Sequence, residues 1–165
     1  VDLALSSPDG QIARLPITSG YWATWAGCFG VAPPLFDFWS SKPATLVAFP
    51  RAEVLAAVAD NPASLMHIVG FLSENVTIFT AWILSATIFS AERRLAYVLL
   101  VLSARNRTGA ATEAVVTREQ LGMLGLGTRQ RVSRLLNNLS GRGLVELREG
   151  RVLIPSRAAL EAYAF

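Results

Sequence analysis

The stretch TREQLGMLGLGTRQRVSRLLNNL, residues 117–139, carries the start signals of two helices with a glycine turn between them. Thr117 and Gln120 have the spacing of a capping box, in which two side chains satisfy backbone N–H groups at the start of a helix. The Gly-Leu-Gly of residues 125–127 indicates a tight turn after a short helix, and Thr128 can cap the next helix. This order of elements predicts a helix-turn-helix.

The second helix of this stretch has one apolar and one polar face. Its apolar side chains recur at spacings of three and four residues, which places them on one stripe toward a core: Val132, Leu135, Leu136 and Leu139. The opposite face gathers polar side chains, namely Gln130, Ser133, Arg134 and Asn137. The helix has no acidic residue, although a solvated surface helix usually mixes both signs of charge. This polar face therefore predicts contact with an anionic partner such as DNA.

Positive charge is concentrated in the last third of the chain. Residues 1–103 carry five basic and seven acidic side chains, whereas residues 104–165 carry ten arginines and five acidic side chains. The two net charges, −2 and +5, account for the total of +3. Lys42 is the only lysine, and arginine is the residue suited to bidentate contacts with phosphate and guanine. The basic surface predicted for a nucleic-acid partner thus lies in the C-terminal part.

The residues that follow predict a wing and a last helix. Glycines within residues 141–143 should end the second helix of the helix-turn-helix. Residues 144–148 and 151–154 then form two strands around a glycine turn, which is the pattern of a hairpin. Ser156 can cap a final helix that reaches Tyr163.

The first 60 residues predict a small β-rich unit, because short apolar runs alternate with turn signals. Three strands are expected, at Leu3–Leu5, Ile12–Leu15 and Thr45–Phe49. A short helix of about residues 51–59 should close the unit.

A long apolar helix is expected to begin at Pro62, with Asn61 as its N-cap. Residues 75–91 contain no charged side chain, which leaves two interpretations. A membrane span is disfavoured because the segment is short and diluted by serine and threonine. A helix buried on several sides in a dimer is favoured. The dimer seam would run through Val69, Leu72, Val76, Phe79 and Ile83. Ser90 indicates the cap of a new helix, and residues 105–112 form a polar link.

Three segments together resemble the Crp/Fnr family of bacterial transcription regulators. Residues 7–20 resemble a hairpin of the family's effector-binding, cyclic-nucleotide-binding-like β-roll. Residues 49–62 resemble the passage into its dimerisation helix, and residues 117–139 closely resemble its DNA-reading unit.

The resemblance implies an α+β fold in three parts. These are a partial β-roll effector domain at residues 1–60, a dimerisation helix at residues 61–90, and a winged helix-turn-helix DNA-binding domain at residues 91–165. It also implies that the front half of the β-roll is missing from this sequence.

In the family, two arginines and a residue between them contact base edges, and the matching positions here are Arg129, Gln130 and Arg134. Many members have glutamate where this chain has Gln130. Because glutamine pairs best with adenine, the half-site should differ from the commonest family site. Ser133 and Asn137 share the same face and complete the base-reading set. Phosphate contacts are expected from side chains that flank it, precede it or lie in the wing: Arg118, Thr128, Arg131, Asn138, Arg148 and Arg151.

The resemblance does not extend to a cyclic-nucleotide pocket. Where nucleotide-binding members have a Gly-Glu pair and later an Arg-Ser pair, this chain has Thr24-Trp25 and a segment, residues 31–39, without a basic side chain. A bound anion would lack a cation, so we exclude a cyclic nucleotide as effector. The aromatic side chains of this region either line an apolar effector pocket or, as we favour, form ordinary core: Trp22, Trp25, Phe36, Phe38 and Trp39.

No metal, cofactor or catalytic site is predicted. His67 is the only histidine, so neither a histidine-based metal cluster nor a Ser-His-Asp triad can form. Haem ligation by His67 is the alternative to a structural or exposed histidine, which we favour. Cys28 is the only cysteine; it excludes an internal disulfide, and a small buried residue is favoured over a redox sensor.

The sequence thus predicts a cytoplasmic homodimer, not an enzyme, that binds double-stranded DNA at a palindromic operator and regulates transcription. RNA polymerase is a further candidate partner, and any small-molecule effector is of unknown identity. The alternative is a winged-helix module that binds another protein and has no specific DNA site.

Overall fold

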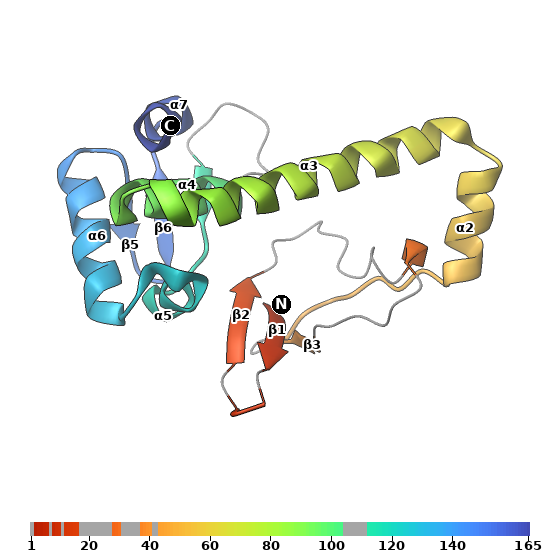
Figure 1. The fold of residues 1–165 in the computed structure, drawn as a ribbon, viewed down its shortest axis with the longest axis horizontal. Helices are drawn as coiled ribbons and strands as arrows, with labels where there is room; N and C mark the ends of the chain where they lie inside the picture. Colours follow the sequence, from red (N-terminus) through yellow and green to blue (C-terminus); the bar gives the residue numbers. More distant parts are fainter. Residues whose placement is uncertain are drawn as a thin grey trace.

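The computed structural model describes residues 2–6, 8–10, 12–16, 28–30, 37–40, 43–103 and 112–165. One long helix runs from a short helix at one end to a compact C-terminal domain at the other, and a small sheet with the N-terminus lies below it (Figure 1). In chain order the elements are β1 (Asp2–Ser6), β2 (Ile12–Pro16), β3 (Asp37–Trp39), α2 (Arg51–Ala59), α3 (Pro62–Ile88), α4 (Ala91–Leu102), β4 (Thr112–Ala114), α5 (Arg118–Leu121), the π-helical turn η1 (Gly122–Leu126), α6 (Arg129–Gly141), β5 (Glu146–Arg148), β6 (Arg151–Ile154) and α7 (Arg157–Ala164).

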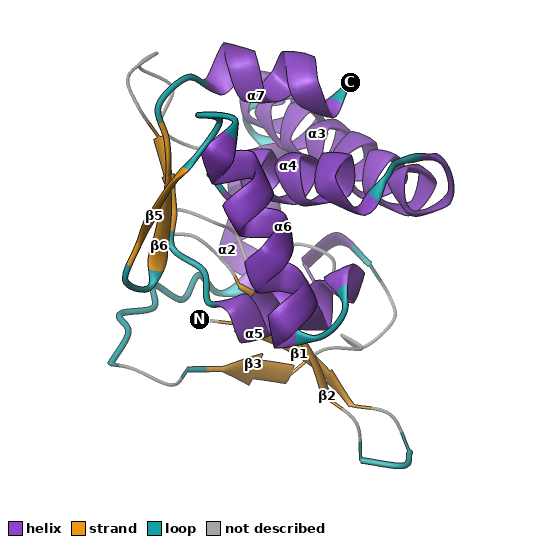
Figure 2. Cartoon of the chain, turned by 90° about the vertical axis from the view of Figure 1, so that its left-hand side faces the viewer, coloured by secondary structure: helices purple, strands orange, loops and turns teal. Residues whose placement is uncertain are grey.

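The N-terminal sheet is antiparallel, with strand order β2-β1-β3. Leu3 of the central strand is opposite Leu15 on one side and Phe38 on the other. The expected strands near residues 3–5 and 12–15 are therefore confirmed. The sheet lies beneath α5 and η1, and β2 contacts both of them (Figure 2).

The strand expected at Thr45–Phe49 was a wrong prediction, because residues 43–50 have no regular structure. Leu46, Val47 and Phe49 are between 69 and 74% exposed. Apolar content alone does not make a strand, since a strand needs a neighbouring backbone for its hydrogen bonds. Among the described strands the place beside β1 belongs to β3, which the sequence analysis did not predict as a strand.

Helix α3 begins as the sequence predicts. The Asn61 side chain accepts hydrogen bonds from the backbone N–H groups of Ala63 and Ser64, and Pro62 occupies the first turn. The helix ends at Ile88, and Ser90 caps α4 by accepting from the N–H of Arg93. The break at residues 89–90 turns the chain back, so that α4 runs beside the last turns of α3.

The core of the C-terminal domain is built around α4. Six consecutive residues of this helix, 95–100, are buried. They are surrounded by apolar side chains of α5, α6, β6 and α7, including Leu121, Leu139, Ile154 and Leu160, each fully buried. Figure 2 shows α4 enclosed between α6 and α7, with the three-stranded sheet β4-β6-β5 at the side. β4 was not predicted, whereas the hairpin of β5 and β6 and the Ser156-capped α7 were.

The predicted capping box is present at α5, where Thr117 and Gln120 exchange hydrogen bonds of 2.9 and 3.1 Å. The first helix loses helical backbone geometry at Leu124 and Gly125, inside η1, which agrees with the predicted end of the short helix. The chain then turns through Gly125 and Gly127, whose φ angles are +79° and +98°. Glycine suits both positions because a Cβ disfavours positive φ. Arg94 of α4 supports the turn from beneath, since its Nη1 donates to the Gly125 carbonyl at 3.2 Å.

Gly122→Ala tests how closely the two sides of this turn approach. Gly122 has a helical φ of −61°, yet a Cβ there would lie 2.6 Å from the Gly127 carbonyl oxygen. We expect the substitution to lower the free energy of unfolding by about 1–3 kcal/mol. The matched control is Gly70→Ala in α3, where a Cβ would meet nothing within 4 Å. That variant should be neutral or gain up to about 1 kcal/mol from helix propensity. Urea denaturation followed by circular dichroism measures both; equal effects would contradict the close-approach argument.

Candidate nucleic-acid interface

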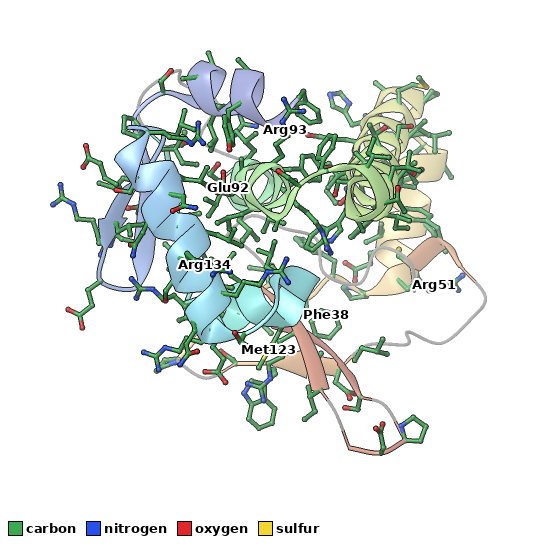
Figure 3. The ribbon with its side chains drawn as sticks, turned by 60° about the vertical axis from the view of Figure 1, so that its left-hand side comes forward. Phe38, Arg51, Glu92, Arg93, Met123 and Arg134 are labelled. Carbon is green, nitrogen blue, oxygen red and sulfur yellow. The ribbon has the colours of Figure 1, made fainter. Side chains whose placement is uncertain are left out.

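The two faces of α6 are divided as the sequence predicts. Its apolar stripe lies in the core, with Val132 and Leu139 fully buried. Gln130, Arg134 and Asn137 are exposed on the opposite side, and Ser133 beside them is half-buried. Figure 3 shows Arg134 on the outer side of α6. The placement agrees with the predicted base-reading face, and the contact of these side chains with DNA stays a prediction.

The N-terminal end of α6 presents a positive electrostatic environment. Thr128 caps the helix, because its Oγ1 accepts a 3.3 Å hydrogen bond from the Arg131 N–H. The remaining free N–H groups of the first turn add the positive end of the helix dipole. Within the part of the chain that the structure describes, Arg129, Arg131 and Arg134 form no ion pair with a carboxylate. These three guanidinium groups can therefore bind an anion without first breaking an ion pair with a carboxylate.

A depression of about 290 Å³ lies between the start of α5, the start of α6 and the wing. Four arginines line it and define what we call the arginine groove: Arg118, Arg129, Arg148 and Arg151. Glu119 is the only carboxylate among its lining residues. The groove therefore combines three elements that are separate in sequence into one basic surface beside the exposed face of α6.

Two of these arginines already have exposed acidic partners. Arg148 contacts Glu146, and Arg151 contacts Glu113, each at 3.3 Å and with every side chain at least 40% exposed. Exposed ion pairs of this kind contribute little to stability because both charges are well solvated. Either arginine can therefore exchange its carboxylate for a phosphate at small cost.

Asn138 is placed differently from the other expected phosphate contacts. Its Nδ2 donates a 2.7 Å hydrogen bond to Oε1 of Glu92, in the first turn of α4. The second carboxylate oxygen, Oε2, accepts a 2.8 Å hydrogen bond from the Tyr163 hydroxyl of α7. Arg142 lies over the Tyr163 ring and approaches Oε2 at 3.9 Å. We call these four residues the Glu92 cluster.

The hydrogen bond from Asn138, then that from Tyr163 and the charge of Arg142, hold the pKa of Glu92 below its ordinary value of 4.5. Burial and the neighbouring carboxylate raise the pKa of Tyr163. The sequence alone gives no sign of this cluster. An acidic residue just after a helix cap is explained equally well by the helix dipole alone, and its partners lie 46 and 71 residues away.

Of the five aromatic residues of the possible effector pocket, Trp22, Trp25 and Phe36 lie outside the described residues. Phe38 and Trp39 are neighbours on β3, so their side chains lie on opposite faces of the sheet and do not line one pocket together. Trp39 is 53% exposed and carries the Arg14 guanidinium over its ring.

His67 and Cys28 differ in their exposure to solvent. His67 is exposed, and its Nδ1 lies 2.8 Å from the carbonyl oxygen of Ala63 in its own helix. Cys28 is buried, and its backbone carbonyl accepts a hydrogen bond from Arg51. Among the described ranges, no three His, Cys, Asp or Glu side chains are close enough together to hold a metal ion.

The predicted dimer seam is an exposed apolar line along α3. Val69, Val76 and Ile83 are 43, 59 and 69% exposed, Phe79 is 38% exposed, and Leu72 is half-buried. By length and composition α3 could also cross a membrane. An 18-residue segment of it has a mean hydropathy of 1.4, and 11% of that segment is buried. Whether α3 forms a dimer seam or spans a membrane, it exposes an apolar surface in the single chain that a second molecule or lipid would have to bury.

Comparison with known proteins assigns the C-terminal domain. Residues 93–163 match the family model of the Crp-like helix-turn-helix domain. No curated protein matches the sequence.

Solved structures share the fold of nearly the whole chain. The CRP-family transcriptional regulator TTHB099 from Thermus thermophilus superposes with a TM-score of 0.64 at 22% identity, over 99% of this chain and 82% of that one. The CRP/FNR-family regulator TTHA1359 of the same organism gives 0.61 at 16% identity, with the same coverage. FixK2 from Bradyrhizobium japonicum gives 0.61 at 17% identity, again over 99% and 82%.

The C-terminal domain is therefore a Crp-like helix-turn-helix domain, and the chain as a whole has the Crp/Fnr fold. The family model covers residues 93–163, and the solved structures extend the likeness in fold to nearly the whole chain.

The pKa of Glu92 predicts a pH-dependent contribution to stability. Because folding lowers this pKa, the folded state binds fewer protons than the unfolded state around pH 4. The stabilisation should be present above about pH 4.5 and lost as the pH falls below it. Glu92→Gln should therefore lower the free energy of unfolding at pH 7 and have a much smaller effect at pH 3. Urea denaturation at the two pH values measures this. Glu161→Gln, which removes an exposed partner of Arg157, is the control; a Glu92→Gln effect that does not change with pH would contradict the prediction.

Proposed function

We propose that this protein is a sequence-specific transcription regulator that binds a palindromic DNA site as a homodimer. The observation that carries the proposal is the exposed, acid-free face of α6 beside the arginine groove. A helix of this kind fits the major groove, and arginines on both sides of it reach the phosphate backbone.

The side chains on α6 supply direct base reading. Arg129 and Arg134 can donate two hydrogen bonds to a guanine, and Gln130 can pair with an adenine. Ser133 and Asn137 lie on the same face. Phosphate contacts fall to Arg118, Arg148 and Arg151 of the groove and to the start of α6, residues 128–131. A site that Gln130 reads should contain adenine where glutamate would select cytosine.

The sequence of α3 supports a parallel dimer. Leu65, Val69, Leu72, Val76, Phe79 and Ile83 repeat with alternating spacings of four and three residues. The β-branched residues fall at one position of this heptad, and leucine or phenylalanine at the other, which favours two parallel strands. At 27 residues the helix is about 40 Å long, enough for a continuous seam. We favour a second copy of α3 over a membrane as the partner of this exposed line, because burial in lipid does not require a heptad pattern.

A two-fold axis along α3 places two copies of α6 on the same side of the dimer. In DNA-binding dimers of this kind the two recognition helices enter successive major grooves, about 34 Å apart. The cytoplasm is the compartment in which such a regulator meets DNA and RNA polymerase.

Selection from a randomised duplex pool, repeated at several salt concentrations, tests the proposal. We expect a two-fold palindrome with half-sites about one helical turn apart, and an affinity that falls steeply with salt because phosphate contacts release counterions. Binding that is independent of salt, or no binding at low salt, would contradict the proposal and favour a protein partner.

Arg134→Ala and Arg118→Ala separate base reading from phosphate contact. Arg134→Ala should cost about 1–3 kcal/mol on the selected palindrome and relax the preference at one base position. Arg118→Ala should weaken palindromic and random DNA by the same factor and reduce the salt slope by about one. Fluorescence anisotropy titrations on both duplexes measure this. The assignment is wrong if the two variants behave alike.

Ile83→Asn tests the seam. Ile83 is 69% exposed in the single chain and lies on the heptad line, so a polar side chain there should shift the protein from dimer to monomer in analytical ultracentrifugation. Affinity for the palindrome should fall by at least about tenfold, because a monomer holds only one half-site. Leu84→Asn is the control, since Leu84 is 56% exposed but lies off the line. If the dimer contact lay elsewhere, the Ile83→Asn variant would remain a dimer, which would contradict the predicted seam.

A further inference from the structure

Glu92 joins three helices through one carboxylate. Its two oxygens accept hydrogen bonds from Asn138 of α6 and Tyr163 of α7, at 2.7 and 2.8 Å. Its side chain is only 24% exposed, although it is charged. Figure 3 shows Glu92 on α4, on the side that faces α6. Each oxygen of the carboxylate therefore has a donor from a different helix.

Apolar side chains of α6 also pack toward α4. Leu135, Leu136 and Leu139 pack into the core around α4. Packing of this stripe decides which face of α6 is buried, but apolar contacts are non-directional and leave small changes in the rotation of the helix open. Hydrogen bonds to a carboxylate are directional and short. The Glu92 cluster is therefore the feature that can define the rotation of α6 about its own axis.

The cluster acts on the helix that carries the base-reading face. Asn138 follows Asn137 directly and lies one turn beyond Arg134, so a rotation at Asn138 moves both side chains. Glu92 itself lies two residues after Ser90, where α3 ends and α4 begins. The orientation of α6 is thus tied to the end of the long helix and not only to the core of its own domain.

The same geometry argues against Asn138 as a phosphate contact. Its amide donates to a carboxylate that is held in place by Tyr163 and approached by Arg142. A phosphate at Asn138 would come close to the negative charge of Glu92, and like charges repel at such distances. Asn138 therefore differs from the arginines of the groove.

We propose that Glu92 is a positioning residue that sets the orientation of α6 on DNA through Asn138 and Tyr163, and that Asn138 serves this cluster and does not bind phosphate. The proposal rests on the proposed function, because it concerns how α6 reads its site.

The test uses the full chain and the palindrome that the wild-type protein selects. Affinity is measured on this palindrome and on random duplex for Glu92→Gln, Asn138→Ala and the double variant, well below their melting temperatures. Glutamine keeps the shape of Glu92 but removes its charge and replaces one acceptor oxygen with an NH2 group that only donates. Glu161→Gln is the matched control, since it removes the same charge from an exposed ion pair on α7.

We expect each single variant to reduce the ratio of specific to random affinity by about tenfold, the effect of losing one hydrogen bond to a charged group. The double variant should lose no more than Glu92→Gln alone, because Asn138→Ala removes a hydrogen bond that Glu92→Gln already disrupts. Affinity for random DNA and the salt slope should follow the Glu161→Gln control. Tyr163→Phe removes only a hydroxyl and should reduce the ratio by about threefold; it keeps the test decisive if Glu92→Gln does not fold.

Other results would overturn the proposal. If Asn138→Ala weakened palindromic and random DNA equally while Glu92→Gln changed neither, Asn138 would be a phosphate contact. Additive losses in the double variant would show that the two residues act separately. An unchanged ratio in Glu92→Gln, with a normal wild-type palindrome, would remove this inference alone. Failure of the wild-type protein to select any palindrome would instead remove the proposed function.

Discussion

The buried apolar surface of α4 is the constraint on which the rest of the C-terminal domain depends. Residues 95–100 are buried in succession, so side chains on every side of this helix need apolar neighbours. The helices α5, α6 and α7 and the strand β6 supply them. Once α6 has its leucine stripe against this core, its polar face must lie outward. The surface offered to DNA is thus a consequence of packing, because the same 3.6-residue period that buries one face exposes the other.

Two polar contacts add to this packing and help to orient α6, one near each end of the helix. Arg94 holds the turn before α6 through the Gly125 carbonyl, although its Nε is buried without a partner among the described residues. Glu92 holds the other end of α6 through Asn138. Both residues lie in the first turns of α4, close to the point where the long helix ends. The apolar core therefore stabilises the domain, and the hydrogen bonds of Arg94 and Glu92, both in α4, help to orient α6.

Two exposed surfaces of the chain differ in chemistry and so in the partner that suits them. The surface around α6 and the wing is rich in arginine, and α6 itself has no acidic residue, which suits a polyanion. The line along α3 is apolar and regular, which suits a second copy of the same helix. Exposure is informative in both cases because neither surface resembles the mixed charges of an ordinary solvated helix.

The sequence by itself determined the helix-turn-helix, its caps, the wing and the two faces of α6, because these depend on local spacing and on glycines at positions of positive φ. It also determined where α3 begins and where α4 starts. Tertiary structure alone decided which apolar runs became strands, since Thr45–Phe49 found no partner among the described strands while residues 37–39 paired with β1. It alone brought together the arginine groove and the Glu92 cluster, whose members come from elements far apart along the chain. Such contacts leave no periodic signal in a sequence, because they depend on how whole elements pack and not on the residues next to them.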